Sequence, residues 1–169
     1  MHYKKDRVAL KPPLGWNSWD CYGPAVNEVQ LLGNARYMAE HLKAHGWQYV
    51  VCDIQWYEPE AGQRHWEYNR FAELCMDGFG RLIPAENRFP SAANGAGFKP
   101  IADQIHALGL KFGIHIMRGM PRMAAHRRLP ILGCDATCAQ AANPNSICAW
   151  NPDMYGLRRE EEGSQAYYD

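Results

Sequence analysis

The sequence predicts an α/β fold that corresponds to the N-terminal part, about three βα units, of a (β/α)8 TIM barrel. Two features of the chain lead to this prediction. A helical pattern, a glycine and a short apolar strand follow one another twice, with Gly46 and Gly109 in equivalent places. Such alternation is typical of a parallel sheet with right-handed crossovers. Long connections follow the strands, as they do where a barrel builds its active site.

The first unit is predicted to begin with a strand in residues 11–20 and to continue as an amphipathic helix. Two prolines at the start of that segment each fix φ and stiffen the chain. Asn27 is expected to cap the helix, with Gln30 at the capping-box position. Gly46 is expected to end it as the glycine after the last turn. The buried stripe at helical spacing is expected to comprise Leu31, Leu32, Ala35, Met38, Ala39 and Leu42.

The second and third strands are expected in residues 49–54 and 110–117, separated by a helix over residues 99–108. Residues 49–54 read YVVCDI. This is a short apolar run of the kind that is buried on both faces of a parallel sheet. The helix that follows is expected to bury, on one face, Ile101, Ile105 and Leu108.

Residues 55–98 and 118–163 are expected to be long connections after strand ends. The first contains Asp77 followed by Gly78, and then Gly80-Arg81-Leu82, which together indicate a small hairpin. The second is rich in Pro, Asn, Ala and Cys and is expected to be a loop until a third helix begins near Gly163. Loops of this length inside a compact domain are usually functional or disordered.

Three strands and at most three helices predict a barrel domain over residues 1–169 that is cut before its fourth strand. An eight-stranded barrel typically needs ~250 residues, and this chain has 169. Residues 1–10 are expected to form an N-terminal extension. Three parallel strands leave an open sheet edge, so the chain is expected to be poorly stable by itself and could self-associate through that edge.

The composition argues against several classes of protein. Eighteen basic residues balance eighteen acidic ones, so neither nucleic acid nor an anionic membrane is an expected partner. The N-terminus lacks the apolar segment of a signal peptide, and no run has the length of a membrane span, so a cytoplasmic location is expected. The six cysteines are expected to be free thiols.

No metal and no cofactor is expected. Cys134 and Cys138 lie four residues apart without a second pair at zinc-site spacing. His41 and His45 could share a helix face, but no third ligand type stands nearby, which favours the surface for both. No glycine-rich phosphate loop precedes a helix, which argues against a phosphate-handling barrel enzyme. That alternative would regain support if an anion bound the arginines of residues 118–128.

Aromatic and polar side chains in the first strand indicate a carbohydrate site. Trp16 and Trp19 stand beside Asn17, Ser18 and Asp20. Indole faces next to hydrogen-bonding groups suit a ring that carries both apolar C–H faces and hydroxyls, as a sugar does. The alternative, in which the tryptophans plug a core at a strand end, is as well supported by this segment alone.

Asp53 is the strongest single candidate for a substrate contact. A carboxylate near the end of an apolar strand is costly unless it is paired or faces a polar site, and the carboxyl ends of barrel strands form the active-site face. Its alternative role is to satisfy a loop backbone. Trp56 could extend the aromatic wall or lie in the core. His115 holds the equivalent place in the third strand, as a ligand contact or a core histidine, and Arg118 could bond hydroxyls or pair with a carboxylate.

The three strand ends carry a resemblance to a known family. They read, in order, PPLGWNSWD, GWQYVVCDIQW and LGLKFGIHI, and between them stand GRLIPAENRFP and GFKPIADQIHALGLKFGI. In this order the motifs resemble the α-galactosidase (melibiase) family of glycoside hydrolases. The resemblance extends over nearly the whole chain from residue 11 onward, and it is specific for the family and not for one substrate.

The resemblance implies a (β/α)8 barrel followed by a β-sandwich domain, and cleavage of terminal α-galactosides with retention. Two aspartates would act, one as nucleophile and one as acid and base, with carboxyl groups ~5–5.5 Å apart in such enzymes. They would end the fourth and sixth strands, beyond residue 169. The resemblance therefore places no catalytic residue in this chain.

What remains corresponds to the substrate pocket. Trp19 matches a tryptophan that packs against the sugar, and Asp53 matches the first of two adjacent aspartates that bond galactose hydroxyls. Ile54 stands where the second would be, and His115 stands where many members have a tyrosine. Gln55, and not Cys52, takes the place of the family cysteine. Loss of one charged partner changes discrimination by roughly 1.5–3 kcal/mol, so a sugar with a different substituent at that position is expected.

The leading hypothesis is a partial glycoside hydrolase of the α-galactosidase type that acts on terminal α-linked sugars and is inactive as this chain alone. The alternative is a non-catalytic carbohydrate-binding protein derived from the same fold. An incomplete barrel is expected to bind sugar weakly or not at all, whereas a binding protein is expected to show clear saturable binding.

Overall fold

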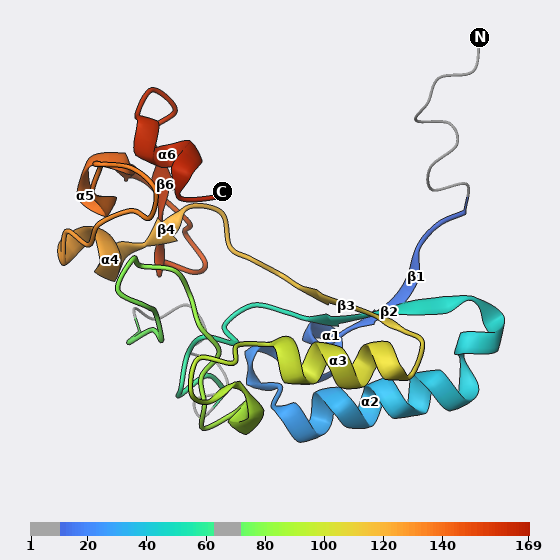
Figure 1. The fold of residues 1–169 in the computed structure, drawn as a ribbon. Helices are drawn as coiled ribbons and strands as arrows, with labels where there is room; N and C mark the ends of the chain where they lie inside the picture. Colours follow the sequence, from blue (N-terminus) through green and yellow to red (C-terminus); the bar gives the residue numbers. More distant parts are fainter. Residues whose placement is uncertain (1–10, 63–71) are drawn as a thin grey trace, which may run out of the picture.

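The computed structural model describes residues 11–62 and 72–169, and the expected N-terminal extension, residues 1–10, lies outside the described residues. Its first part is a parallel sheet of three strands in the order β1-β2-β3. Helices α2 and α3 cover one face of this sheet (Figure 1). The predicted parallel βα units are confirmed, and the described residues contain no closed barrel. The strands are β1 (Leu14–Asn17), β2 (Trp47–Cys52) and β3 (Lys111–Ile114).

The first connection begins with a short helix and not with a continued strand. β1 ends at Asn17, and α1 (Trp19–Tyr22) and the 3-10 turn η2 (Gly23–Ala25) follow it. Ser18 continues the sheet by one hydrogen bond, because its backbone N–H donates to the carbonyl of Val51 at 3.0 Å. Trp19 therefore starts a helix two residues beyond the strand, which corrects the expectation of a strand over residues 11–20.

The predicted cap of helix α2 (Glu28–His41) is confirmed. The Asn27 side chain accepts from the backbone N–H of Gln30 at 3.0 Å, and the Gln30 side chain accepts from the N–H of Asn27 at 3.1 Å. The predicted end of the helix is wrong by one turn. The 3-10 turn η3 (Lys43–His45) follows α2, and Gly46, with φ of 94°, closes that turn in the left-handed region.

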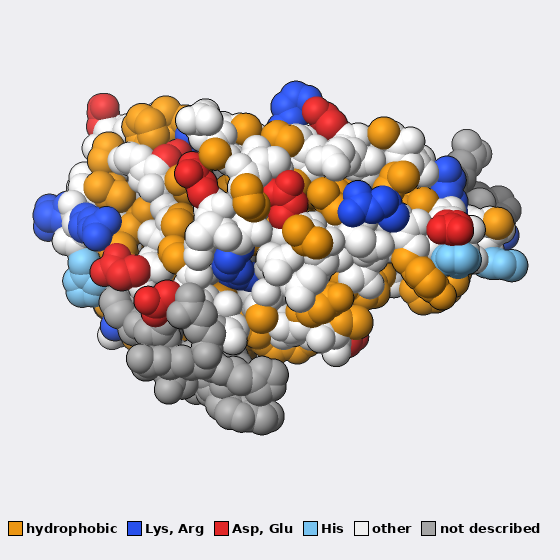
Figure 2. Space-filling model, turned by 90° about the horizontal axis from the view of Figure 1, so that it is seen from below, with side chains coloured by type: hydrophobic (Ala, Val, Ile, Leu, Met, Phe, Trp, Pro, Cys, Tyr) orange, Lys and Arg blue, Asp and Glu red, His pale blue; other side chains and the backbone are white. Residues whose placement is uncertain are grey.

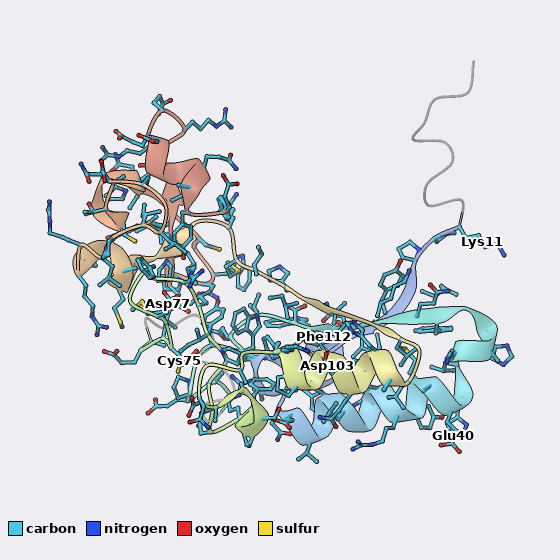
Figure 3. The ribbon with its side chains drawn as sticks, in the orientation of Figure 1. Lys11, Glu40, Cys75, Asp77, Asp103 and Phe112 are labelled. Atoms are coloured by element: carbon cyan, nitrogen blue, oxygen red, sulfur yellow. The ribbon has the colours of Figure 1, made fainter. Side chains whose placement is uncertain are left out.

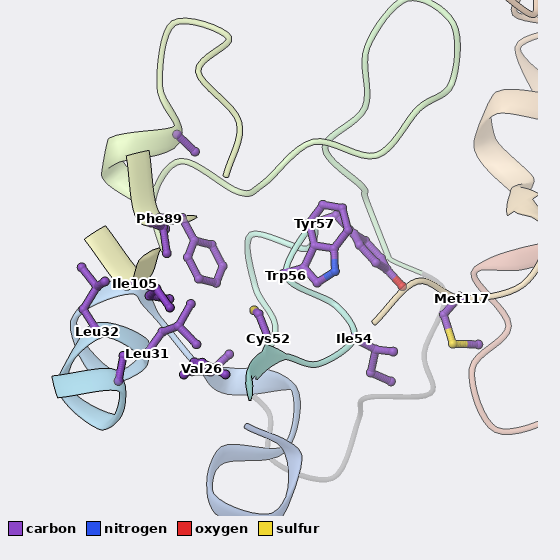
Figure 4. Close-up of a cluster of buried hydrophobic side chains, with 14 of the residues drawn as sticks. Val26, Leu31, Leu32, Cys52, Ile54, Trp56, Tyr57, Phe89, Ile105 and Met117 are labelled. Atoms are coloured by element: carbon purple, nitrogen blue, oxygen red, sulfur yellow. The ribbon is translucent and has the colours of Figure 1, made fainter. Parts of the chain in front are cut away.

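The core begins between the sheet and its two helices and continues past the carboxyl ends of the strands to Trp56, Tyr57 and Met117 (Figure 4). Helix α3 (Lys99–Ala107) contributes Ile101 and Ile105, which are fully buried, and Leu108 follows the helix half-buried. From β2 come Val50 and Cys52, both fully buried. The predicted stripe of α2 is buried at Leu31, Leu32, Ala35 and Met38, whereas Ala39 and Leu42 are half-buried at its margin.

The opposite face of the sheet is open, so the expected burial of β2 on both faces is wrong. Tyr49 is 36% exposed and Val51 is half-buried, although both alternate with the buried residues of the same strand. Gly15 pairs with Tyr49 across the strands, and a Cβ at Gly15 would lie 2.6 Å from the Tyr49 Cβ. No described element covers this face, and burial on both faces requires a second layer.

The connection between β2 and α3 contains the predicted hairpin. Met76 and Leu82 form an antiparallel bridge, and the Asp77 N–H donates to the Arg81 carbonyl at 2.9 Å. Asp77 and Cys75 are labelled on this connection in Figure 3. A 3-10 turn, η4 (Pro90–Ala92), precedes α3. Residues 63–71 of the predicted connection lie outside the described residues.

The second connection forms a small subdomain of its own, and the expectation of a long loop is wrong there. Strands β4, β6 and β5 form an antiparallel sheet in that order (Figure 1). Pro121 lies in β4 and Pro144 in β5, the two edge strands of this sheet, where proline costs no ladder hydrogen bond. Its elements are β4 (Met120–Pro121), α4 (Arg122–His126), α5 (Cys138–Ala141), β5 (Ala142–Ile147), β6 (Met154–Leu157) and α6 (Glu162–Ala166).

Helix α6 begins one residue before Gly163, which confirms the predicted third helix. The subdomain has its own core, which includes Met120, Ala124, Cys138 and Ala141, all fully buried. On the surface seen from below, Figure 2 shows charged side chains of both signs mixed with apolar ones. No helix in residues 11–62 and 72–169 combines the length and the apolar character of a membrane span.

Candidate functional site

Five side chains line an open cavity of about 210 Å³ at the carboxyl ends of the parallel strands. They are Trp19, Asp53, Ile54, His115 and Trp150. Trp19 begins α1, just after β1. Asp53 and Ile54 lie in the turn after β2, and His115 directly follows β3. A pocket smaller than the roughly 300–1,000 Å³ of drug-sized sites suits a single small ring.

Parallel pairing brings these residues together. Cys52 is the register partner of Ile114, so the residues that follow them, Asp53 and His115, emerge side by side. The N–H of His115 donates to the carbonyl of Cys52 at 2.9 Å, and the N–H of Asp53 donates to the Ser18 hydroxyl at 2.9 Å. Ser18 is fully buried between β1 and β2. The backbone under the cavity is therefore held from both neighbouring strands.

The Asp53 carboxylate serves the local backbone and also borders the cavity. Its Oδ1 accepts from the N–H of Ile54 at 2.7 Å and lies 3.9 Å from Nδ1 of His115. The side chain of Asp53 is 14% exposed and that of His115 is 45% exposed. The backbone-supporting role and the ligand-facing role are thus compatible in one residue. A protonated imidazole at this distance would pair with the carboxylate, and both groups can bond hydroxyls.

Two tryptophans form an aromatic corner beside this pair. The ring centroids of Trp19 and Trp150 lie 6.4 Å apart with an interplanar angle of 70°, an edge-to-face arrangement that aromatic rings favour. The backbone N–H of Trp19 donates to Oδ1 of Asn17 at 2.8 Å. Trp150 was missed in the sequence. Its signal was a second aromatic residue among polar neighbours, in the run Trp150-Asn151-Pro152-Asp153, which resembles the composition of residues 16–20.

Three of the predicted site residues do not line this cavity. Trp16 borders a hollow of about 290 Å³ on the open face of the sheet, with Tyr49 and Val51. Trp56 is 3% exposed and lies in the core, where its Nε1 donates to the carbonyl of His115 at 2.9 Å. It therefore supports the cavity floor instead of forming a wall. Arg118 is exposed on the chain that leads away from the sheet.

Arg88 fastens the turn that carries Asp53. Its guanidinium donates to the carbonyls of Gln55 and Glu58 in that turn and of Pro24 and Val26 before α2, over 2.5–2.9 Å. The residue is 8% exposed, and burial lowers the pKa of Arg88 from its ordinary value. It remains charged, because the pKa of an arginine starts so high. Charge-assisted hydrogen bonds of this kind are about twice as strong as neutral ones.

The buried thiol of Cys52 contributes to packing and not to chemistry. Burial raises the pKa of Cys52 to about 12, while the charge of Arg88 acts to lower it and that of Asp53 to raise it. A thiol with such a pKa stays protonated at neutral pH and is a poor nucleophile and metal ligand. Among the described residues, no three His, Cys, Asp or Glu side chains are grouped as a metal site would require.

The groups that line the cavity are of the kinds that suit a small polyhydroxylated ring. Trp19 and Trp150 offer apolar faces, Asp53 offers acceptor oxygens, and His115 offers a donor or an acceptor. Asp53 is the carboxylate that lines this cavity in the described chain, whereas a glycosidase uses two. The arrangement supports binding more directly than bond cleavage.

Comparisons with known proteins find similar glycoside hydrolases. No family model matches the chain. The curated alpha-galactosidase of Cyamopsis tetragonoloba is 33% identical over 70% of this chain and 24% of its own length. A solved structure of a GH27 β-L-arabinopyranosidase variant from Geobacillus stearothermophilus, in complex with arabinose, is 57% identical with a TM-score of 0.92. The match extends over 99% of this chain and 38% of the arabinopyranosidase chain.

A third relative is a solved structure from Bacillus halodurans, proposed to be an alpha-N-acetylgalactosaminidase. It is 62% identical, with a TM-score of 0.88, over 95% of this chain and 37% of its own. The chain spans about a quarter of the length of the curated relatives that it matches.

Proposed function

This chain belongs to the GH27 α-galactosidase family of glycoside hydrolases, and we propose that it supplies part of the sugar pocket of such an enzyme. The cavity between Trp19, Asp53, His115 and Trp150 carries this proposal. It lies at the carboxyl ends of parallel strands, where barrels of this kind hold their substrates. We further propose that neither catalytic aspartate belongs to this chain, so that it hydrolyses no glycoside by itself.

The apolar side chain of Ile54 supports a preference among related sugars. It lies beside Asp53 in the cavity wall and is 2% exposed. A second carboxylate there would favour a sugar with a hydroxyl in reach, whereas an isoleucine favours a sugar that has none. The pyranose ring of L-arabinose has the hydroxyl configuration of D-galactose and lacks its hydroxymethyl group. We therefore propose a terminal arabinopyranoside as the preferred substrate class, with a galactoside as the weaker one.

A non-catalytic carbohydrate-binding protein remains the second candidate. The observation that favours it is the cavity itself, which is already lined on several sides in this chain. The two candidates differ in the strength of binding. A partial enzyme pocket is expected to hold arabinose only in the millimolar range, whereas a dedicated binding protein is expected to bind in the micromolar range. The cytoplasmic location and self-association through the open sheet edge stay predictions.

The test uses the 169-residue chain with L-arabinose and D-galactose. Saturation-transfer NMR is expected to show contact between aromatic protons and arabinose, with a weaker signal for galactose, and Asp53→Asn is expected to reduce both. Aryl β-L-arabinopyranosides and aryl α-galactosides are expected to stay intact. Turnover at enzyme-like rates would refute the assignment of the catalytic residues. Micromolar saturable binding by calorimetry would favour the binding protein, and no sugar contact at all would refute a pocket in this chain.

A further inference from the structure

We propose that Trp150 contacts the bound sugar as the second aromatic wall of the pocket, and that a hydrogen bond between Gln55 and Asp153 positions it. This inference rests on the proposed function. Trp150 is 46% exposed, yet it packs edge-to-face against Trp19 at one corner of the cavity that Asp53 and His115 also line. It comes from the second subdomain, between β5 and β6, so the two walls are 131 positions apart in the sequence.

The residues that follow Trp150 are fixed to the rest of the molecule. Asn151 and Asp153 are both fully buried. The Asn151 side chain accepts from the N–H of Asp153 at 3.2 Å, and the N–H of Arg122 donates to the Asp153 carbonyl at 2.9 Å. The Arg122 guanidinium also donates to the carbonyl of Pro152 at 3.0 Å. An exposed tryptophan at the end of so firmly held a segment keeps its position without a ligand.

One of these attachments leads directly to the other side of the pocket. The carboxylate of Asp153 accepts from Nε2 of Gln55 at 3.3 Å and from the N–H of Ala72 at 3.3 Å. Gln55 follows Asp53 and Ile54, so the turn that carries two pocket residues also holds the segment that carries Trp150. We call this contact the Gln55–Asp153 clamp.

The backbone of Gln55 indicates that its position is imposed by its surroundings. Its φ is 60°, in the left-handed region that residues other than glycine rarely occupy. Such conformations are energetically unfavourable and persist where surrounding contacts determine them. Here the Arg88 guanidinium holds the Gln55 carbonyl at 2.6 Å, and the Asp153 carboxylate holds its side chain. The strained residue thus links the acidic wall of the pocket with its second aromatic wall.

A pyranose in this corner would meet indole surfaces on two sides. The rings of Trp19 and Trp150 are inclined by 70°, so a pyranose can place one apolar C–H face on one indole while its edge faces the other. Asp53 and His115 would then meet its hydroxyls. Removal of Trp150 leaves the other wall and both polar groups in place, so the loss should appear in binding and not in folding.

The first experiment removes the ring. In Trp150→Ala, the exciton signal of the Trp19–Trp150 pair in far-ultraviolet circular dichroism is expected to disappear. The saturation-transfer signal of L-arabinose is expected to fall at least threefold, while Trp150→Phe is expected to retain much of it. Tyr37→Ala is the matched control, because Tyr37 is 60% exposed on α2. It is expected to change neither signal, and thermal unfolding is expected to be the same for all three variants.

The second experiment exchanges the amide and the carboxylate of the Gln55–Asp153 clamp. Gln55→Glu places two carboxylates against each other and is expected to weaken both the exciton signal and the arabinose contact. The double variant Gln55→Glu/Asp153→Asn exchanges amide and carboxylate between the two sides, so both signals are expected to return. Recovery of this kind would not follow from a general loss of stability. Failure of the double variant to recover either signal, with the fold intact, would refute the positioning role.

The outcomes separate this inference from the proposed function. If the wild-type chain contacts arabinose and Trp150→Ala contacts it equally well, the aromatic wall is refuted and the pocket stands. If the wild-type chain contacts no sugar, the proposed function fails and this inference fails with it. An unchanged exciton signal in Trp150→Ala would refute the tryptophan corner whatever the sugar result.

Discussion

Arg88 is expected to contribute more to stability than any exposed charge of the chain, because its buried guanidinium joins the turn after β2 to the segment before α2 through four hydrogen bonds. In Arg88→Met, four carbonyls lose their donor: two in the turn after β2 and two before α2. The methionine retains the apolar length of the side chain, and the contact with the Phe89 ring, 5.5 Å from the guanidinium carbon to its centroid, can persist in part. The change therefore isolates the polar role.

The magnitude follows from these contacts. A hydrogen bond to a charged group contributes about 1.5–3 kcal/mol, so four of them amount to about 6–12 kcal/mol before any offset. The variant avoids the cost of removing a guanidinium from water on folding, which offsets several kcal/mol of this loss. Removal of one partner from a buried charged network typically costs about 3–5 kcal/mol in total. We expect that value for Arg88→Met. Because domains have unfolding free energies of about 5–15 kcal/mol, this change would take a large share of the total.

Urea unfolding followed by tryptophan fluorescence measures the effect. Arg88→Lys keeps the charge but lacks the planar fork, so it is expected to recover less than half of the loss. Arg36→Met, at an exposed position of α2, is the matched control and is expected to stay within about 0.5 kcal/mol of the wild type. A loss below about 1 kcal/mol for Arg88→Met would refute the idea that these four bonds hold the turn under the pocket.

Three further predictions concern residues outside the pocket. Exposed Cys21 is expected to react with a thiol reagent well before Cys52, whose pKa of about 12 keeps it protonated; mass spectrometry of the partly labelled native chain tests the order, and equal rates would contradict it. Burial acts to raise the pKa of Asp77, but hydrogen bonds from Arg81 and the turn backbone lower it overall. The ionised Asp77 therefore contributes its full share to the unfolding free energy above the unfolded pKa of about 3.9. This contribution is lost as the pH falls through the lower pKa of Asp77 in the folded chain. Asp77→Asn is expected to lower the unfolding free energy by about 1 kcal/mol at neutral pH. It is also expected to weaken the fall of the unfolding free energy at acid pH, as measured by urea titrations at several pH values. An unchanged pH dependence would contradict this prediction. Gly33→Ala on α2, where a Cβ meets nothing within 4 Å, is expected to raise the unfolding free energy by about 0.5–1 kcal/mol, and a loss of stability would contradict that reasoning.

Local signals in the sequence were sufficient where neighbours along the chain determine the structure. The capping box at Asn27 and the hairpin at Asp77 depend on residues within five positions, and both are confirmed. The parallel sheet also followed, because apolar strands that alternate with helices have few other arrangements. The convergence of Asp53 and His115 followed in turn, since carboxyl ends of adjacent parallel strands share one edge.

Where distant segments meet, sequence reasoning was wrong or silent. The antiparallel sheet over residues 120–157 was expected to be loop, because its edge strands contain prolines that usually indicate turns. Trp56 was expected at the site and lies in the core. Tyr49 was expected to be buried and faces an open side of the sheet. In each case burial depends on which element lies opposite, and periodicity does not specify that.

The sequence by itself determined the family, the three parallel βα units and the strand ends that meet at the candidate pocket. These depend on short-range patterns and on motifs in a fixed order. Only the tertiary structure showed which distant residue lines the pocket beside Trp19. Trp150 reaches Trp19 because the second subdomain packs on the turn after β2, and the buried carboxylate of Asp153 meets Gln55 there. Contacts between residues about a hundred positions apart leave no periodic trace in the chain, since they arise from the packing of whole elements.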